Sequence, residues 1–460
     1  MLKISITDDH DHIIGRYKDE TLTIASPNPS EPLHLDADEL RVVLLRLSRF
    51  SGIRHLRLEG RVVIHGQPTE LFCHLNARTM ELDGLELPDA TSMARMFAGT
   101  QSLVELRLPQ SLDIRHVTDM SEMFRGSGIV SLDLPDDFDT SHVTSMRAMF
   151  SHCHGLLDIS FPKSFNTSSV TDMSEMFMCC DHMESLVLPQ DLDTSSVTDM
   201  SLMFRFCKRL QGLALPKTFD TANVTGMSAM FEGCMFLGTL ELPERFDTSR
   251  VTDMSSMFST CTRLTSLRLP DAFATDNVTD MSHMFADCSS LKTLCLPDAF
   301  SGNEVKTTCD MFCWCGAIED VTFPKSFATP KLESASDMFH GCHSLRRLVL
   351  PQGFSTREAI DMNGMFRACE SLKEIGLPTS FGTQSAEDVS LMFYECSSLE
   401  TLELPDEFDV THVKHYSCMF SECQSLRVIR LGTSCANALR NTRGQGLGSD
   451  VRLIERPWTA

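Results

Sequence analysis

Thiol chemistry is the first possibility that this sequence raises, because 18 of its 460 residues are cysteines. Cys309, Cys313 and Cys315 stand close together in a C-x3-C-x-C pattern beside Trp314. A structural zinc site needs four ligands in a tetrahedral arrangement. The sequence contains no C-x-x-C pair, so we predict that this cluster binds no metal and that its thiols belong to the protein core.

Most of the cysteines recur at one position relative to a repeated phenylalanine. Eleven lie three residues after it: Cys153, Cys180, Cys207, Cys234, Cys261, Cys288, Cys315, Cys342, Cys369, Cys396 and Cys423. Buried free cysteine behaves as a small apolar side chain. Stacked strands would hold these side chains parallel, whereas a disulfide needs a torsion of about 90°. We therefore expect reduced core thiols, which fits a reducing compartment.

Carboxylates and hydroxyls also form rows along the chain. The aspartate rows are Asp119, Asp172, Asp199, Asp253 and Asp280, and Asp139, Asp193, Asp220 and Asp247; the threonine row is Thr140, Thr167, Thr194, Thr221, Thr248 and Thr275. Stacked carboxylates could bind calcium, but calcium-binding solenoids use glycine-rich nonapeptides. We predict that the aspartates cap turns and that the threonines form a hydroxyl ladder along a bend.

Catalytic patterns are missing from the sequence. The 16 histidines are scattered, and no HExxH, GxSxG, phosphate-binding loop or dinucleotide-binding GxGxxG occurs. Nothing places a nucleophile beside a base. We predict a protein that is not an enzyme, with no cofactor and no small-molecule substrate.

The strongest regularity is a repeated Met-Phe pair. It occurs thirteen times between Met96 and Met419, and eleven of the twelve intervals are 27 residues, the other being 26. A unit of this length cannot bury a core by itself, so neighbouring units must stack. A fixed period in this range predicts a solenoid.

Residues 243–269 illustrate one repeat, PERFDTSRVTDMSSMFSTCTRLTSLRL. Leu267 and Leu269 alternate with polar residues, which predicts a short strand that Pro270 ends. A second apolar set has helical spacing of three, four and three residues: Val251, Met254, Phe258 and Cys261. We therefore expect one strand and one short helical turn in each repeat.

The repeat resembles a known family. Its L-x-x-L-x-L strand is typical of leucine-rich repeats, and the combination M-x-x-M-F-x-x-C-x-x-L-x-x-L-x-L-P resembles the BspA-like repeats of bacterial surface proteins. Residues 170–177, 197–204 and 251–258 carry the VTDMSxMF form of that family. The resemblance covers about residues 82–431. It implies a bacterial leucine-rich-repeat protein but does not fix a function, since such folds serve many binding tasks.

The predicted fold class is therefore an α/β solenoid of the leucine-rich-repeat type, curved, with a parallel strand in each 27-residue repeat and short helical turns on the opposite side. We expect an N-terminal cap at residues 1–50, with strands at residues 2–6 and 21–24 and a helix at residues 37–49. The solenoid would occupy residues 51–432, and residues 433–460 a C-terminal cap or tail. Residues 305–308 lose the V-T-D-M sequence, which predicts a local bend or bulge.

The overall charge excludes several partners. The net charge is −23 and no run of lysine or arginine occurs, so binding to nucleic acid or to an acidic lipid surface is not expected. No stretch approaches the 18 apolar residues of a membrane span. No apolar core of a signal peptide is visible at the N-terminus. We expect a cytoplasmic protein, or one that is secreted without a cleaved signal peptide.

The predicted binding surface is the exposed face of the strands. If the leucines point inward, the residues between them face solvent and vary from repeat to repeat. The polar residues expected to contact a partner are Glu241, Arg268, Arg347, Glu374, Glu403 and Arg430. Small, nearly neutral residues lie between them, which favours a broad protein partner.

Three functions remain open at this level. The first is a protein-interaction scaffold, which could be a bacterial effector that is secreted without a leader peptide and acts in virulence. The second is an exported surface adhesin that binds a host protein. The third is an enzyme hidden in the flanking segments, which are short and lack a paired nucleophile and base. The sequence does not indicate an oligomeric state.

Overall fold

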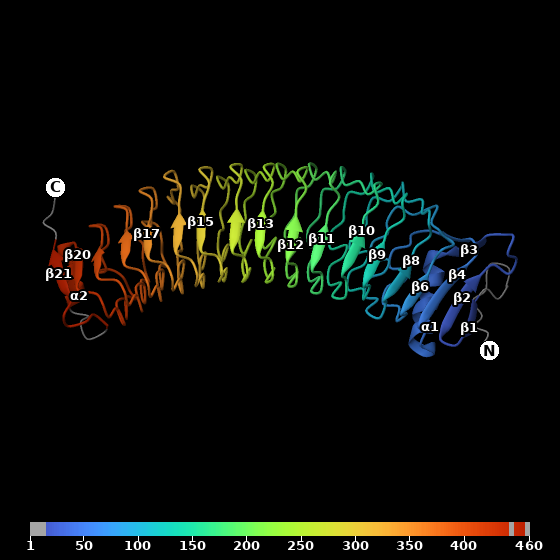
Figure 1. The fold of residues 1–460 in the computed structure, drawn as a ribbon, viewed down its shortest axis with the longest axis horizontal. Coiled ribbons are helices and arrows are strands. Elements are labelled where there is room, and N and C mark those ends of the chain that lie inside the picture. Colours follow the sequence, from blue (N-terminus) through green and yellow to red (C-terminus); the bar gives the residue numbers. More distant parts are fainter. Residues whose placement is uncertain (1–14, 441–445, 456–460) are drawn as a thin grey trace. The chain divides into compact units, whose positions relative to one another are not determined.

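The structure, a computed structural model, describes residues 15–440 and 446–455. The chain forms two compact units, Met1–Asn223 and Val224–Ala460. Within each unit, short strands follow one another side by side in chain order (Figure 1). Consecutive repeats pair in parallel, so the prediction of a leucine-rich-repeat solenoid with one strand per repeat is confirmed.

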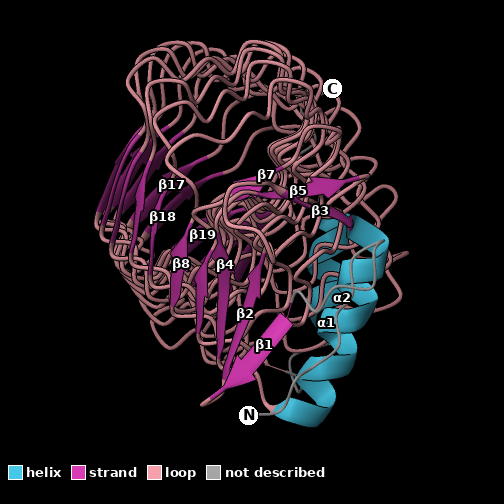
Figure 2. Ribbon diagram, turned by 90° about the vertical axis from the view of Figure 1, so that its right-hand side faces the viewer, coloured by secondary structure: helices cyan, strands magenta, loops and turns pink. Residues whose placement is uncertain are grey.

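Unit 1 begins with a mixed sheet and one helix. Its elements are β1 (Gly15–Lys18), β2 (Thr21–Ala25), β3 (Leu33–Asp36), α1 (Ala37–Ser51), β4 (His55–Glu59), β5 (Val62–His65), β6 (Thr79–Glu81), β7 (Leu85–Glu86), β8 (Glu105–Arg107), β9 (Ser131–Asp133), β10 (Asp158–Ser160), β11 (Ser185–Val187) and β12 (Gly212–Ala214). β1 is antiparallel to β2, and the order then runs β2, β4, β6, β8 in parallel. β3, β5 and β7 form a separate parallel sheet (Figure 2).

The helix α1 has the termini that its sequence specifies. Asp36 precedes it and accepts hydrogen bonds from the backbone N–H groups of Asp38 and Glu39, at 2.9 and 3.1 Å. Gly52 ends it with φ of 61°, a conformation that glycine adopts without strain. The strand expected at residues 21–24 and the helix expected at residues 37–49 are thus present, whereas the strand expected at residues 2–6 lies outside the described residues. A capping role for this segment stays a prediction.

Unit 2 continues the same architecture. Its elements are β13 (Thr239–Glu241), β14 (Ser266–Arg268), β15 (Thr293–Cys295), β16 (Asp320–Thr322), β17 (Arg347–Val349), β18 (Glu374–Gly376), β19 (Thr401–Glu403), β20 (Val428–Leu431), α2 (Thr433–Arg440) and β21 (Arg452–Glu455). Figure 2 shows β17, β18 and β19 on one side of their turns, with loops completing each turn. Pairing continues through the divergent repeat, as Asp280, Thr307, Ser334 and Asp361 are successive parallel bridge partners. The bulge expected there does not interrupt the register.

Each repeat bends at its proline and threonine. In residues 243–269 the carbonyl of Pro243 accepts the N–H of Phe246 at 2.9 Å, which closes the bend after the preceding strand. The buried hydroxyl of Thr248 donates to the carbonyl of Ala274 in the next repeat at 2.6 Å. In the following repeat, Thr275 is bonded to Ser301 in the same way. The predicted threonine ladder is therefore confirmed.

The side opposite the strand consists of turns rather than helices. The four apolar residues expected on a helix, Val251, Met254, Phe258 and Cys261, are all fully buried. However, the backbone N–H groups donate alternately to a carbonyl of the same repeat and to a carbonyl of the next repeat. Those of Met257 and Cys261 bond three residues back, at 3.2 and 3.3 Å, whereas that of Phe258 donates to Met284 in the next repeat at 2.9 Å. The turns thus form a second ladder between repeats.

Two residues in each turn adopt the left-handed conformation. In this repeat they are Ser256, with φ of 57°, and Thr260, with φ of 58°. The position of Thr260 is held by glycine in some other repeats, for example Gly126 and Gly341. The reversal of φ explains why a helical spacing of apolar residues does not produce a helix here, since an α-helix requires negative φ throughout.

Phenylalanines and cysteines fill the core between the two ladders. In unit 2 the rings from Phe231 to Phe420 stack on their neighbours with centroids 5.1–5.9 Å apart. The repeat thiols donate to the carbonyl of the phenylalanine of the preceding repeat, at 2.9–3.3 Å, for example Cys261 to Phe231 and Cys288 to Phe258. All 18 cysteines are free thiols, in agreement with the sequence prediction. Burial raises the pKa of Cys153 and Cys261 to about 12.

The aspartate rows are turn caps, as predicted. Asp253 accepts the N–H of Ser255 at 2.8 Å, and Asp247 accepts the N–H of Ser249 at 2.8 Å. These two-residue bonds are Asx turns, which use the carboxylate locally. In the part of the chain that the structure describes, no helix is both long enough and apolar enough to cross a bilayer.

Thiol labelling tests the core. Thirteen cysteines are buried, four are half-buried and Cys295 is exposed. Because only thiolates react and burial raises the thiol pKa, Cys295 should react first with a thiol reagent, and Cys295→Ser should remove the fast phase. The buried thiols should react only after denaturation. Rapid reaction of more than the five accessible thiols in the native protein would contradict this packing.

Removing one rung of the threonine ladder tests the bend. The hydroxyl of Thr275 donates to the carbonyl of Ser301 at 2.5 Å and accepts its N–H at 2.7 Å. Thr275→Val leaves that buried N–H without an acceptor, which should lower the free energy of unfolding by about 1–3 kcal/mol. Thr265→Val is the control, because its hydroxyl is exposed, and it should change stability by less than about 0.5 kcal/mol. Equal urea midpoints for the two variants would show that the ladder is not stabilising.

Candidate recognition face

The exposed face of the strands is built by a strict alternation. In the three-residue strands β8 to β17 the central residue is buried and the two outer residues are exposed. Leu240, Leu267 and Leu348 are the inward residues in β13, β14 and β17, and each is at most 9% exposed. Leu269, which was expected to be buried, is only half-buried. The outward residues of successive repeats form two rows, and we call these rows within each unit the strand face.

All six sequence-predicted contact residues lie on the strand face of unit 2 and are exposed. The structure brings them together as three register pairs: Glu241 with Arg268, Arg347 with Glu374, and Glu403 with Arg430. The first pair is separated from the second by β15 and β16. The six residues are therefore not one continuous charged patch, and their role in binding stays a prediction.

Two of these pairs are ion pairs. Arg347 Nε lies 3.3 Å from a Glu374 carboxylate oxygen, and Arg430 Nε lies 3.2 Å from Glu403. Arg268 instead approaches Glu244, at 3.8 Å. These side chains are 44–81% exposed. Exposed ion pairs contribute only about 0–1 kcal/mol to stability. A binding partner could therefore break these ion pairs and form its own with the same side chains at a small cost in free energy.

A small hollow opens on the strand face at Gly376. Its volume is about 370 Å³, and its lining includes Glu374, Gly376, Thr401 and Glu403. A side chain at Gly376 would meet Val349, whose Cγ1 lies 3.3 Å from the position of the missing Cβ. The hollow therefore exists because glycine occupies an outward position. Lys373 also lines it, so the hollow carries charges of both signs.

Exposed apolar residues were not singled out from the sequence. Val187 is 76% exposed on β11, and Val349 is 50% exposed on β17. Both stand at outward positions that carry polar or small residues in most repeats. The sequence signal that identifies Val187 and Val349 is an apolar residue at a repeat position that is expected to face solvent. Val349 and Gly376 add an apolar wall and a hollow to the charged pairs of β17, β18 and β19.

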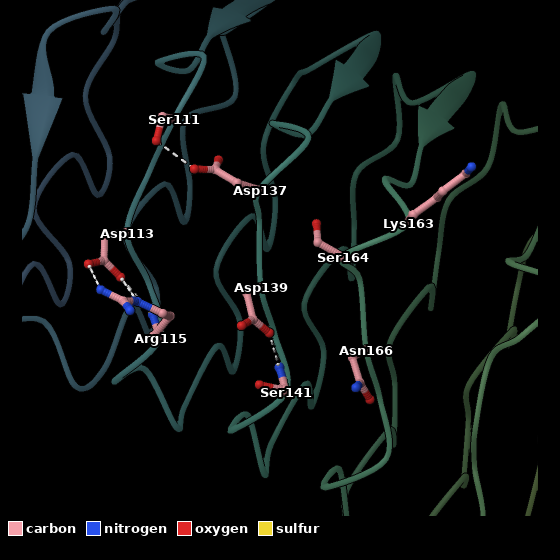
Figure 3. A pocket seen from close by; sticks show the side chains of 9 residues that line it. All are labelled: Ser111, Asp113, Arg115, Asp137, Asp139, Ser141, Lys163, Ser164 and Asn166. Atoms are coloured by element: carbon pink, nitrogen blue, oxygen red, sulfur yellow. Dashed lines mark hydrogen bonds and ion pairs between the residues drawn. The ribbon is translucent and has the colours of Figure 1, made fainter.

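A larger polar groove lies in unit 1, at the bends of three successive repeats. It measures about 700 Å³ and is lined by Ser111, Asp113, Arg115, Asp137, Asp139, Ser141, Lys163, Ser164 and Asn166 (Figure 3). Its aspartates are already engaged. Arg115 lowers the pKa of Asp113 to about 2 by hydrogen bonding, Asp139 accepts the N–H of Ser141 at 3.0 Å, and Asp137 accepts from Ser111 at 2.5 Å. These contacts serve the bends, so the groove offers no free carboxylate pair.

The cysteine cluster is not arranged as a metal site. Cys315 donates its thiol to the carbonyl of Phe285 at 3.0 Å, and Cys309 contacts the hydroxyl of Ser334 at 2.9 Å. Cys313 lies 3.8 Å from His340 Nδ1. Among the described residues, no group of three or more histidine, cysteine, aspartate or glutamate side chains is placed to hold a metal ion.

Comparison with known proteins places the repeats in a family. Five overlapping segments match the family described as "Mycoplasma protein of unknown function, DUF285": residues 69–187, 153–241, 212–321, 235–349 and 310–429. Together they span most of the chain, which agrees with the resemblance to BspA-like repeats. A search among curated proteins gave no match.

Solved structures agree on the fold. A leucine-rich repeat protein from Bacteroides ovatus is 15% identical, with a TM-score of 0.53, and the alignment covers 96% of this chain and 98% of that one. A leucine-rich cell surface protein from Faecalibacterium prausnitzii is 14% identical over 96% of this chain and 92% of that one, but its TM-score of 0.30 is too low to carry an argument. The first likeness supports the leucine-rich-repeat fold and, at this identity, nothing finer.

A double-mutant cycle tests whether the pair of Arg347 and Glu374 is structural. Combining Arg347→Ala with Glu374→Ala should give a coupling energy below about 1 kcal/mol, because both side chains are about two-thirds exposed. The coupling should fall as salt is added. A coupling of about 2 kcal/mol or more that resists salt would assign the pair to the scaffold rather than to a replaceable surface.

Proposed function

This chain belongs to the DUF285 family, and from that premise we propose that it is a non-catalytic protein-interaction scaffold that recognises its partner through the strand face. The observation that carries the proposal is the separation of roles within each strand. The inward residue is buried in every repeat from β8 to β20, while the outward residues, exposed except for the half-buried Gly376 and Val428, change from repeat to repeat. A constant frame with a variable surface suits recognition.

The chemistry of the face indicates the kind of partner. The stretch from β17 to β20 combines the ion pairs of Arg347 and Arg430, the exposed Val349 and the hollow at Gly376. Interfaces between proteins join apolar contacts with arginine and with satisfied polar groups. An open surface that mixes charged and apolar groups fits a protein better than a small molecule, which needs an enclosed and mostly apolar pocket.

The cellular location is part of the proposal. Eighteen free thiols support a compartment that keeps cysteine reduced. We therefore favour a protein that works in a cytoplasm, either in the cell that makes it or in a host cell as a secreted effector. The resemblance to surface-protein repeats keeps an exported adhesin as the alternative. Fractionation of native cells separates the two, since an adhesin would be recovered at the cell surface.

The test of the strand face uses paired variants. Arg268→Ala with Arg347→Ala removes two exposed positive charges and should leave folding unchanged, because exposed substitutions shift stability by only about 0.5 kcal/mol. Affinity for the physiological partner, isolated by crosslinking and purification, should fall by about tenfold or more, because arginine is enriched at binding hot spots. The readout is the Kd from a titration of the purified pair.

A matched control distinguishes this effect from a general change in charge. Lys331→Ala with Arg357→Ala also removes two exposed positive charges, each paired with a glutamate, and neither residue belongs to the strand face. This control should bind the partner as the unmodified protein does. Equal affinities for both double variants would overturn recognition through the strand face.

A further inference from the structure

A second exposed surface, centred on Trp314, lies on the ladder of turns rather than on the strand face. Trp314 is 51% exposed and adopts the left-handed conformation, with φ of 60°. Bulky side chains rarely adopt this conformation, and glycine stands at the same position in other repeats, for example Gly126 and Gly341. The left-handed conformation itself belongs to every repeat, since Phe206, Thr260 and Asp287 share it at this position. What distinguishes Trp314 is that a large aromatic ring is about half exposed there, which makes the ring available to a partner.

The ring rests on a seat that only glycine provides. A Cβ at Gly341 would lie 2.8 Å from Trp314 Cε3 and 3.1 Å from Cδ2, so the six-membered ring lies directly over Gly341. His340 and His343 border the indole, with ring centroids 4.8 and 5.9 Å away. The ring is thus held in place from below and from two sides, while the remaining surface stays open.

Acidic residues stand in the repeats before and after Trp314. Asp287 occupies the equivalent position one repeat earlier, and its N–H donates to the carbonyl of Cys313 at 2.7 Å, which places it in register with Trp314. No hydrogen bond or ion pair engages the Asp287 carboxylate within the described residues. Asp337 lies 3.3 Å from His340 Nδ1 and Glu370 lies 3.5 Å from His343 Nδ1, so acidic groups also border the two histidines.

We propose that Trp314 and Asp287 form a binding site for an arginine side chain presented by a protein partner. A guanidinium stacks on the face of an indole by cation–π attraction and can donate a planar pair of hydrogen bonds to a carboxylate. The register places the indole and the carboxylate at the same turn position of two adjacent repeats. Its acidic border complements a positive charge and disfavours an acidic partner. This surface is separate from the strand face, so the inference does not depend on the function proposed above.

The fluorescence of Trp314 gives a direct readout. Trp314 and Trp458 are the only tryptophans in the sequence, so Trp458→Phe leaves Trp314 as the single reporter. The probe is an acetylated and amidated tri-arginine peptide, and the uncharged control is the same peptide with citrulline. Tri-arginine should change the emission saturably and citrulline should not. An unresponsive emission, or an equal response to citrulline, would overturn the proposal.

Two matched pairs of variants in that background assign the site. Asp287→Asn should raise the half-saturating concentration of tri-arginine by about fivefold, as expected for loss of one exposed charge contact, whereas the exposed Asp271→Asn should not. Gly341→Ala should weaken binding similarly because it displaces the ring. Gly126→Ala is its control, since it has the same left-handed backbone with no atom nearer than 3.8 Å. Equal effects within either pair would contradict the assignment.

Discussion

Every repeat carries backbone N–H groups that only the next repeat can satisfy. Phe258 donates to Met284 and Phe285 donates to Met311, both at 2.9 Å. These groups are buried among apolar side chains, where an unpaired N–H would cost about as much as a lost hydrogen bond and its desolvation. Successive repeats must therefore stack in register. A repeat of another length is accommodated only if it keeps the bonds of both ladders, as the 26-residue interval does, where Phe124 donates to Met149 at 2.8 Å.

The register explains why the sequence repeats so closely. Because equivalent residues lie beside one another, each must pack against a copy of itself, and phenylalanine does so by stacking, with centroids 5.3–5.8 Å apart in unit 1. Threonine and cysteine can each bond to the backbone of a neighbouring repeat. Only outward positions escape this requirement. Val187 and Gly376 differ from their equivalents at such outward positions. Trp314 also differs, but it depends on its neighbour, since its ring fits over Gly341.

The features that follow from the repeat period were predicted correctly from the sequence. The feature that depends on backbone conformation, the helical turn, was predicted wrongly. Repeat length, the inward leucines, the free thiols and the Asx turns all follow from residue type and spacing. The helical turn did not, because the spacing of Val251, Met254, Phe258 and Cys261 records which side chains are buried and is compatible with turns that contain positive φ. Of the strand face, the sequence indicated the outward positions. The pairing of Arg347 with Glu374, and the hollow at Gly376, depend on distances between neighbouring strands that a single repeat does not encode.

The most direct test of the turn conformation is whether one glycine substitution raises or lowers the free energy of unfolding. Thr260 has φ of 58° and its N–H donates to Ala286 in the next repeat at 2.7 Å. Thr260→Gly should therefore raise the free energy of unfolding, by roughly 0.5–1 kcal/mol, since glycine relieves the left-handed strain. The neighbouring Ser259→Gly should lower it. If the segment were a helix, Thr260→Gly would instead destabilise the protein by roughly 0.5 kcal/mol, and that result would contradict the account.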